Sequence, residues 1–107
     1  MDRECHYALV SQQLDKFSAA IQNQLLEYAG SYTAIFEQSI DSYPQRLHPL
    51  LENVQQQYQQ RRWQEDIDSI RERVECCGAQ VLPITGEDYP QQLKQIVGAP
   101  PLLYVRG

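Results

Sequence analysis

Long hydrophobic runs are missing from this sequence of 107 residues. A helix that crosses a membrane needs about 20 consecutive apolar residues, and no run approaches that length. The first residues, Met1, Asp2, Arg3 and Glu4, also lack the basic start and the apolar stretch of a secretory signal peptide. The sequence therefore predicts a soluble, cytoplasmic protein with no membrane partner. Its hydrophobic fraction of 42% is enough for one small core.

Positive charge is scarce, because 9 Lys and Arg stand against 14 Asp and Glu, a net charge of −5. Affinity for DNA without sequence preference comes mainly from cations that replace counterions along the phosphates. This balance excludes a strongly basic nucleic-acid binder. The weak candidates for DNA binding are the adjacent pair Arg61 and Arg62 and the neighbouring Trp63, whose ring is able to stack on a base. A core position for Trp63 is the alternative, since it fits an apolar stripe and acids follow it at once.

Cysteine and histidine are also rare. The three cysteines, Cys5, Cys76 and Cys77, favour a reducing compartment over a disulfide framework, and we expect packing plus one exposed thiol from the adjacent pair. His6 and His48 fall in separate segments and no C-x-x-C spacing occurs, so we predict no metal site. A glycine-rich phosphate loop, a Ser-His-Asp order and a catalytic carboxylate pair are missing too. We therefore expect no catalytic residue, no cofactor and no enzyme.

Glycine is absent between residues 31 and 77, whereas glycine and proline crowd the residues that follow. This change at Gly78 predicts a boundary between a helical N-terminal domain, residues 1–77, and a second part, residues 78–107. In the first part the apolar residues recur at steps of three to five, which is typical of helices. We predict a mainly α fold with a bundle of about five helices.

Caps and prolines predict where these helices begin and end. Ser18 and Ser31 are good N-cap residues, and Gly30 suits the left-handed position after a helix. Residues 3–29 should therefore form two helices with a break at 15–18. Pro44 and Pro49 each suit the first turn of a further helix. The apolar stripe expected to face inward in residues 3–29 consists of Leu9, Val10, Leu14, Phe17, Ile21, Leu25 and Tyr28.

From residue 49 to residue 77 the apolar stripe changes direction. Leu51, Val54 and Tyr58 share one face, but the step of five to Trp63 rotates the following stripe by about a third of a turn. We expect either a bend at 60–62 or two halves that pack against different neighbours. The second stripe consists of Trp63, Ile67, Ile70, Val74 and Cys77, after which Gly78 ends the helix.

After Gly78 the pattern favours strands. Residues 79–84 predict a buried strand that Pro83 places near an edge, and residues 85–88 predict a turn. Pro90 should open a short helix that Gly98 ends, and residues 102–105 predict a second buried strand. A strand, a helix and a strand are the beginning of an α/β layer. The residues of the short helix expected to face inward are Leu93, Ile96 and Val97.

The last nineteen residues carry a recognisable motif. An acid precedes Tyr-Pro, a Leu follows three residues after that Pro, and a Pro-Pro pair leads into a Leu-Tyr-Val-x-Gly strand. This order resembles the start of the conserved region in the bacterial DNA-processing (DprA, or Smf) family. The matching positions, for which we expect a structural role, are Tyr89, Pro90, Leu93, Pro100, Pro101, Leu103, Tyr104 and Gly107.

The resemblance implies a helical domain of the sterile-alpha-motif or helix-hairpin-helix type, followed by a Rossmann-like domain that begins at residue 78. It also implies a protein of natural transformation and recombination, which binds single-stranded DNA, forms a dimer with a second subunit and assists the loading of RecA. The family's DNA-contacting motif follows the Tyr-Val-x-Gly strand, so no DNA-contacting residue transfers to this chain. A supporting or protein-interaction role is the expectation for residues 1–107.

The turn at residues 13–18 differs from a DNA-binding helical hairpin. Such a hairpin uses glycine to bring backbone N–H groups close to a phosphate, whereas this turn has no glycine and contains Asp15. We therefore expect a protein partner for this part of the chain rather than DNA. Two alternatives remain open: a stand-alone helical interaction module whose last thirty residues only mimic the motif, and a small nucleotide-binding enzyme truncated before its active site.

Overall fold

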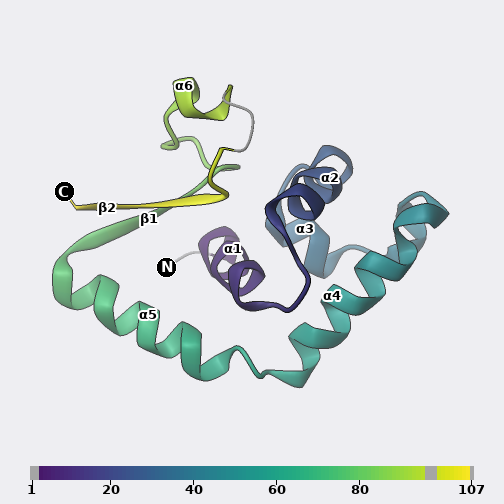
Figure 1. Cartoon of the computed structure of the whole chain (residues 1–107), viewed down its shortest axis with the longest axis horizontal. Helices are drawn as coiled ribbons and strands as arrows, with labels where there is room; N and C mark the ends of the chain where they lie inside the picture. The colour runs from purple at the N-terminus through teal and green to yellow at the C-terminus, as the bar shows by residue number, and fades with distance from the viewer. Residues whose placement is uncertain (1–2, 96–98, 107) are drawn as a thin grey trace.

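The computed structural model describes residues 3–95 and 99–106, and the fold is mainly helical, as predicted (Figure 1). Two short 3-10 turns, Ile40–Ser42 and Gln45–Leu47, connect the third and fourth helices. No helix among the described residues is long and apolar enough to cross a membrane. The helices are α1 (Arg3–Gln13), α2 (Ala19–Ala29), α3 (Tyr32–Glu37), α4 (His48–Gln60), α5 (Gln64–Cys77) and α6 (Gln91–Lys94), and the strands are β1 (Ala79–Pro83) and β2 (Leu102–Arg106).

The predicted caps are present at the ends of the first helices. The Ser18 hydroxyl accepts from the Ile21 N–H at the start of α2, and Ser31 does the same for Ala34 in α3. Gly30 ends α2 at φ 81°, a left-handed conformation that glycine adopts without steric cost. Pro49 lies in the first turn of α4, whereas Pro44 precedes only a 3-10 turn, which corrects the expected helix there.

The predicted break between residues 60 and 62 is confirmed. Arg61 ends α4 with a left-handed φ of 57°, and α5 begins at Gln64 after Trp63. Figure 1 shows α4 and α5 as the two arms of an open V, with α1 lying between them and the rest of the fold. The rotated apolar stripes therefore face two different groups of neighbours.

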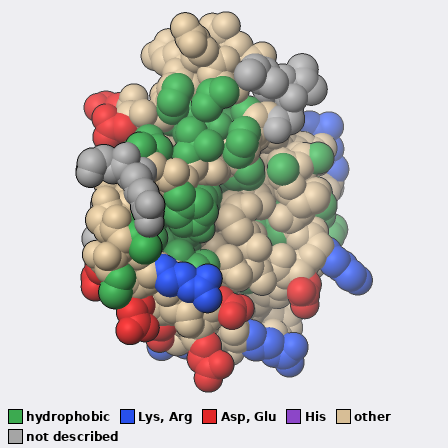
Figure 2. Space-filling view, turned by 60° about the vertical axis from the view of Figure 1, so that its left-hand side comes forward, with side chains coloured by type: hydrophobic (Ala, Val, Ile, Leu, Met, Phe, Trp, Pro, Cys, Tyr) green, Lys and Arg blue, Asp and Glu red, His purple; other side chains and the backbone are tan. Residues whose placement is uncertain are grey.

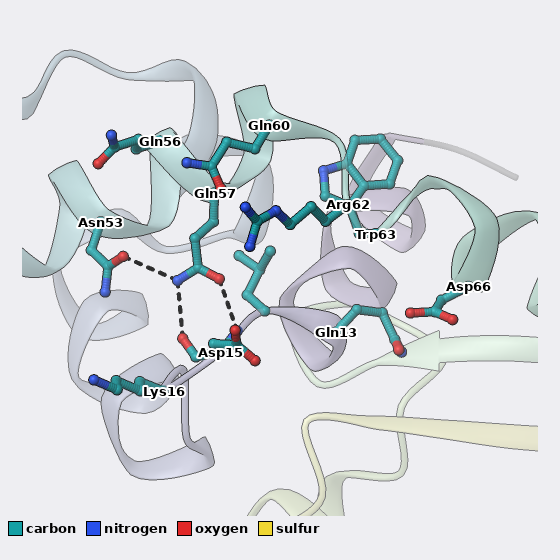
Figure 3. Close-up of a pocket in the computed structure, with 11 residues that line it drawn as sticks. Gln13, Asp15, Lys16, Asn53, Gln56, Gln57, Gln60, Arg62, Trp63 and Asp66 are labelled. Carbon is teal, nitrogen blue, oxygen red and sulfur yellow. Dashed lines mark hydrogen bonds between the residues drawn. The ribbon is translucent and has the colours of Figure 1, made fainter.

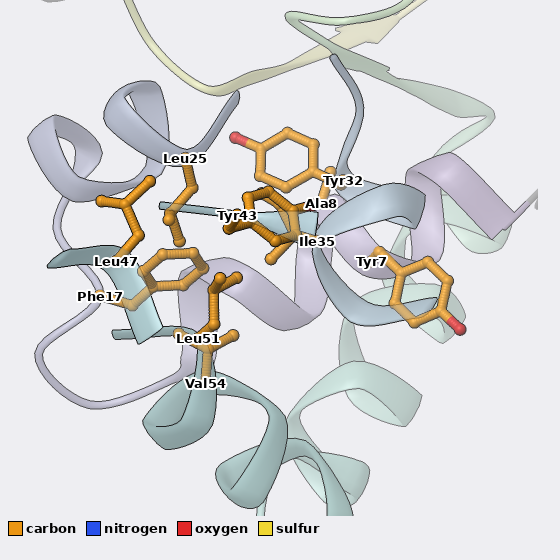
Figure 4. Close-up of a cluster of buried hydrophobic side chains, with 10 residues drawn as sticks. All are labelled: Tyr7, Ala8, Phe17, Leu25, Tyr32, Ile35, Tyr43, Leu47, Leu51 and Val54. Atoms are coloured by element: carbon orange, nitrogen blue, oxygen red, sulfur yellow. The ribbon is translucent and has the colours of Figure 1, made fainter. Parts of the chain in front are cut away.

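Two hydrophobic clusters meet at α1. The larger one joins α1 to α2, α3 and α4 (Figure 4), and the smaller one joins Leu9 and Val10 to α5 and β1. Tyr28, which we expected to face inward, is 47% exposed and lies under the Arg46 guanidinium instead. The buried members of the larger cluster are Tyr7, Ala8, Phe17, Leu25, Tyr32, Ile35, Tyr43, Leu47, Leu51 and Val54.

The two strands pair antiparallel, with Val81 opposite Tyr104. Strands joined by a crossover helix pair in parallel, so β1, α6 and β2 together form a long hairpin rather than a complete crossover unit. Val81 is buried, but Tyr104 is 54% exposed and Val105 is 38% exposed. The predicted strand at residues 102–105 is confirmed, but the prediction that it is buried is wrong, because the helices cover only the inner edge of this small sheet. Figure 2, in which the left-hand side of Figure 1 comes forward, shows hydrophobic side chains gathered in the middle and upper part of that face.

The hairpin connection differs from the expectation in one further respect. The α6 helix forms after Pro90, as predicted, but it ends at Lys94 and has no buried residue, and Leu93 is only half-buried. Ile96, Val97 and Gly98 lie outside the described residues. Cys76 and Cys77 are both exposed at the end of α5, so the expectation that one of them packs inward is wrong. The apolar face of α5 ends one turn earlier, at the half-buried Val74.

Candidate functional site

A polar groove of about 460 Å³ lies between the α1–α2 turn and the α4–α5 junction (Figure 3). Leu14 and the edge of Trp63 are its apolar lining, and side-chain amides from α1 and α4 provide most of its polar surface. The groove brings together two segments that sequence analysis considered separately, the turn at residues 13–18 and the pair Arg62 and Trp63. It is therefore the candidate functional site.

The turn on one side of the groove is held by α4. The Gln57 side chain accepts from the Asp15 N–H at 2.8 Å and donates to the Asp15 carbonyl at 3.0 Å. A third bond runs from the Gln57 amide nitrogen to the Asn53 side-chain oxygen on the same helix, at 3.1 Å. Lys16 has a left-handed φ of 60°, the conformation that would favour glycine. The Asp15 N–H, one of the groups that a phosphate would need, is therefore already used within the chain.

Trp63 lies on the opposite side and belongs mainly to the core. Its side chain is 6% exposed, its ring stacks on Tyr58 with centroids 5.0 Å apart, and its Nε1–H donates to the Tyr58 carbonyl at 2.9 Å. A nucleic-acid base would find no open ring face there. Arg61 and Arg62 are both exposed, and Arg62 alone of the two lines the groove. Their contact with nucleic acid stays a prediction.

A carboxylate that sequence analysis did not single out connects the helices to the hairpin. Glu4 of α1 accepts from the N–H groups of Tyr32 and Thr33 at the start of α3, at 2.8 and 2.9 Å. It also accepts from the hydroxyl of Thr33 and from that of Thr85, just after β1. Burial alone would raise the pKa of Glu4, but the hydrogen bonds, that from Thr85 foremost, outweigh it and hold the pKa below its ordinary value. Glu4 is therefore ionised at neutral pH.

The family-motif residues have different environments. Tyr89 is 1% exposed, its hydroxyl donates to the Pro100 carbonyl at 2.7 Å, and the Pro101 carbonyl accepts from the Ile84 N–H at 2.8 Å. Pro90 occupies the N-cap position of α6 and is exposed, and Leu103 is half-buried. Tyr104 lines a shallow apolar hollow beside Val74 and Cys77. Gly107 lies outside the described residues, so the packing role expected for the motif is observed most clearly at Tyr89.

Removing the Tyr89 hydroxyl should loosen the hairpin. We expect Tyr89→Phe to lower the free energy of unfolding by about 1 kcal/mol, because the Pro100 carbonyl loses a buried hydrogen-bond donor. Urea denaturation followed by circular dichroism measures this change. The matched control is Tyr104→Phe, an exposed tyrosine for which we expect a change within about 0.5 kcal/mol. Equal losses in both variants would contradict a specific role for the Tyr89 hydroxyl.

Metal-binding chemistry finds no support within residues 3–95 and 99–106, where no group of three or more His, Cys, Asp or Glu side chains could hold an ion. The Nε2 of His6 lies 3.2 Å from the Tyr58 hydroxyl, and burial, with a smaller effect of the Arg71 charge, lowers the pKa of His6. His6 is therefore neutral and packed among aromatic rings at pH 7. Comparisons of the chain with protein-family models, with curated proteins and with solved structures gave no match.

Proposed function

We propose that this chain is the N-terminal part of a DprA-like protein, and that it supports single-stranded DNA binding and RecA loading through contacts with protein. In this proposal α1 to α5 correspond to the helical domain of the sterile-alpha-motif or helix-hairpin-helix type, and residues 78–107 begin the Rossmann-like domain. The complete protein would bind single-stranded DNA, RecA and a second subunit in the cytoplasm. This chain would carry the protein contacts.

The observation that carries the proposal is the burial of Tyr89 with its hydroxyl on Pro100. These two residues belong to the two halves of the motif, which are eleven positions apart in the sequence. The spacing of the motif has a structural effect in this chain. The Tyr89 side chain binds the Pro100 carbonyl and so closes the connection between β1 and β2. This contact gives both halves of the motif a packing role, which supports the proposal.

Charge and hydrogen bonding support a protein partner over DNA. The chain carries a net charge of −5, and the groove is lined by two cations, Lys16 and Arg62, and by two acids, Asp15 and Asp66. Phosphate binding needs an excess of cations or free backbone N–H groups. The two acids leave the groove without an excess of cations, and the Asp15 N–H of the turn is already bonded to Gln57.

A DNA titration tests this division of roles. Fluorescein-labelled oligo-dT is mixed with the chain at moderate salt, and the fluorescence anisotropy is recorded. We expect no binding below micromolar protein, because the released counterions that drive such binding require cationic contacts. Tight binding, with a strong dependence on salt, would show that this chain contacts DNA itself.

The coding sequence after codon 107 tests the family. A Rossmann-like pattern with a Gly-x-Arg loop would support the DprA-like proposal, and a stop codon there would contradict it. A stop codon would favour the second candidate, a stand-alone helical interaction module. One observation favours that candidate: the hairpin packs back on the helices, through Val81 in the smaller cluster and through the bond from Thr85 to Glu4.

A further inference from the structure

The groove between the α1–α2 turn and the α4–α5 junction contains polar side chains that the fold does not use. Among the described residues, Gln56, Gln60 and Arg62 line the groove and make no hydrogen bond or ion pair with another side chain or backbone group. Figure 3 shows the Arg62 side chain extending over the groove towards Gln57 and Gln60. Exposed amides and one guanidinium therefore surround an apolar lining of Leu14 and Trp63.

The neighbouring Gln57 shows what such an amide does in this groove. Its oxygen accepts from the N–H of Asp15, and its nitrogen donates to the carbonyl of the same residue. A β-strand binds one residue of its neighbour in the same way, through one bond to the N–H and one to the carbonyl. A primary amide can do this because it carries an acceptor and a donor side by side. Gln56 and Gln60 have the same chemistry, and their amides are not yet paired with backbone. An extended peptide offers the groups that they need.

Charge in the groove favours a particular kind of peptide. Arg62 presents a planar fork of donors that fits a carboxylate, and the half-buried Leu14 gives the chain of a ligand an apolar surface to cover. Asp15 and Asp66 line the same groove and balance the cations, so they oppose the dense negative charge of a nucleic-acid backbone. One isolated carboxylate placed at Arg62 meets less of that repulsion than a chain of phosphates does.

We infer that this groove binds an extended segment of a partner protein, whose backbone pairs with Gln56 and Gln60 and whose Asp or Glu side chain binds Arg62. The inference rests on the proposed function, because it names the surface that would carry the protein contacts. It also predicts the chemistry of the partner segment: an unstructured or strand-forming stretch with one acidic residue between uncharged ones.

Nuclear magnetic resonance on the labelled chain provides the test. The probe is a short capped peptide of alternating threonine and valine with glutamate at its centre, and its two counterparts carry glutamine or lysine there. We expect the glutamate peptide to shift the side-chain amide signals of Gln56 and Gln60 at millimolar concentration or below. The lysine peptide should bind about tenfold more weakly, because it places a cation beside Arg62.

Two arginine variants separate a specific contact from a general effect of charge. Arg62→Gln should weaken the glutamate peptide about tenfold, to the affinity of the glutamine peptide. Arg61→Gln is the matched control, since Arg61 is adjacent and exposed but does not line the groove, and we expect it to leave binding unchanged. Unchanged circular dichroism spectra confirm that both variants fold. Equal weakening by both variants, or equal shifts with the lysine peptide, would overturn the inference.

The outcomes also distinguish this inference from the function on which it rests. If none of the peptides shifts the groove signals and oligo-dT does not bind either, the groove inference fails and the proposed DprA-like role keeps its own test in the coding sequence. If oligo-dT displaces the glutamate peptide from the groove, the site binds nucleic acid, and both the inference and the proposed division of roles fail.

Discussion

Glu4→Ala should lower the free energy of unfolding by about 3 kcal/mol, since hydrogen bonds to charged groups are the strongest that a side chain makes. The Glu4 carboxylate accepts from two N–H groups and two hydroxyls. Without it, the N–H groups of Tyr32 and Thr33 lose their acceptor at the start of α3, where no backbone carbonyl replaces it. Urea denaturation at pH 7 measures the loss. Glu27→Ala, an exposed glutamate of α2, is the control and should change stability by no more than about 0.5 kcal/mol.

The same carboxylate makes stability depend on pH. Because the hydrogen bonds hold the pKa of Glu4 below its ordinary value of 4.5, the ionised group contributes its full stabilisation above that pH. The contribution falls as the pH drops through the folded-state pKa and the carboxylate takes up a proton. We therefore expect the difference in unfolding free energy between the wild type and Glu4→Gln to shrink on acidification. A difference that stays constant from neutral to acid pH would show that the charge of Glu4 is not involved.

Trp63→Ala should be the most destabilising single substitution in the α4–α5 junction, at about 4 kcal/mol. The indole fills the smaller cluster beside Leu9 and Val10, stacks on Tyr58 and donates to the Tyr58 carbonyl. Deleting it leaves a cavity between α1 and α5 and removes the donor that closes the bend. Thermal unfolding followed by circular dichroism is the measurement, because the chain has no other tryptophan to report fluorescence.

Two controls identify the cause of that loss. Trp63→Phe keeps most of the buried ring and should cost about 2 kcal/mol, mainly from the lost hydrogen bond and the smaller volume. Arg62→Ala changes the adjacent exposed residue and should stay within about 0.5 kcal/mol. A small effect of Trp63→Ala together with a large effect of Arg62→Ala would contradict the prediction, because it would show that surface contacts and not core packing stabilise this junction.

Local signals predicted the helix ends well. The caps formed by Ser18, Gly30 and Ser31 bond to backbone groups within one helical turn. The sequence near each residue is therefore enough to predict its cap. The step of five between Tyr58 and Trp63 likewise predicted the break, because the direction of an apolar stripe is a local property of the helix. The groove was not predicted, because the turn at residues 13–18 and the pair Arg62 and Trp63 were considered separately and their proximity is a long-range property.

Long-range contacts could not be predicted in this way. Glu4 has no distinguishing neighbour in the sequence, and its partner Thr85 is 81 positions away. The exposure of Tyr104 depends on which of the two strands the helices cover, and a run of apolar residues does not contain that information. The antiparallel pairing was missed because the short helix suggested a crossover, whereas the chain turns back on itself after α6.

The bond between Thr85 and Glu4 also has a consequence for how the chain folds while it is being synthesised. During synthesis α1 leaves the ribosome first, but the last donor to its Glu4 and the Val81 that covers Leu9 and Val10 are made only after α5. Closing the loop of 81 positions between Glu4 and Thr85 costs about 4 kcal/mol of chain entropy. A nascent chain that ends before residue 79 therefore has an incomplete α1 environment, and the first helix becomes fully stable only when the hairpin has been synthesised.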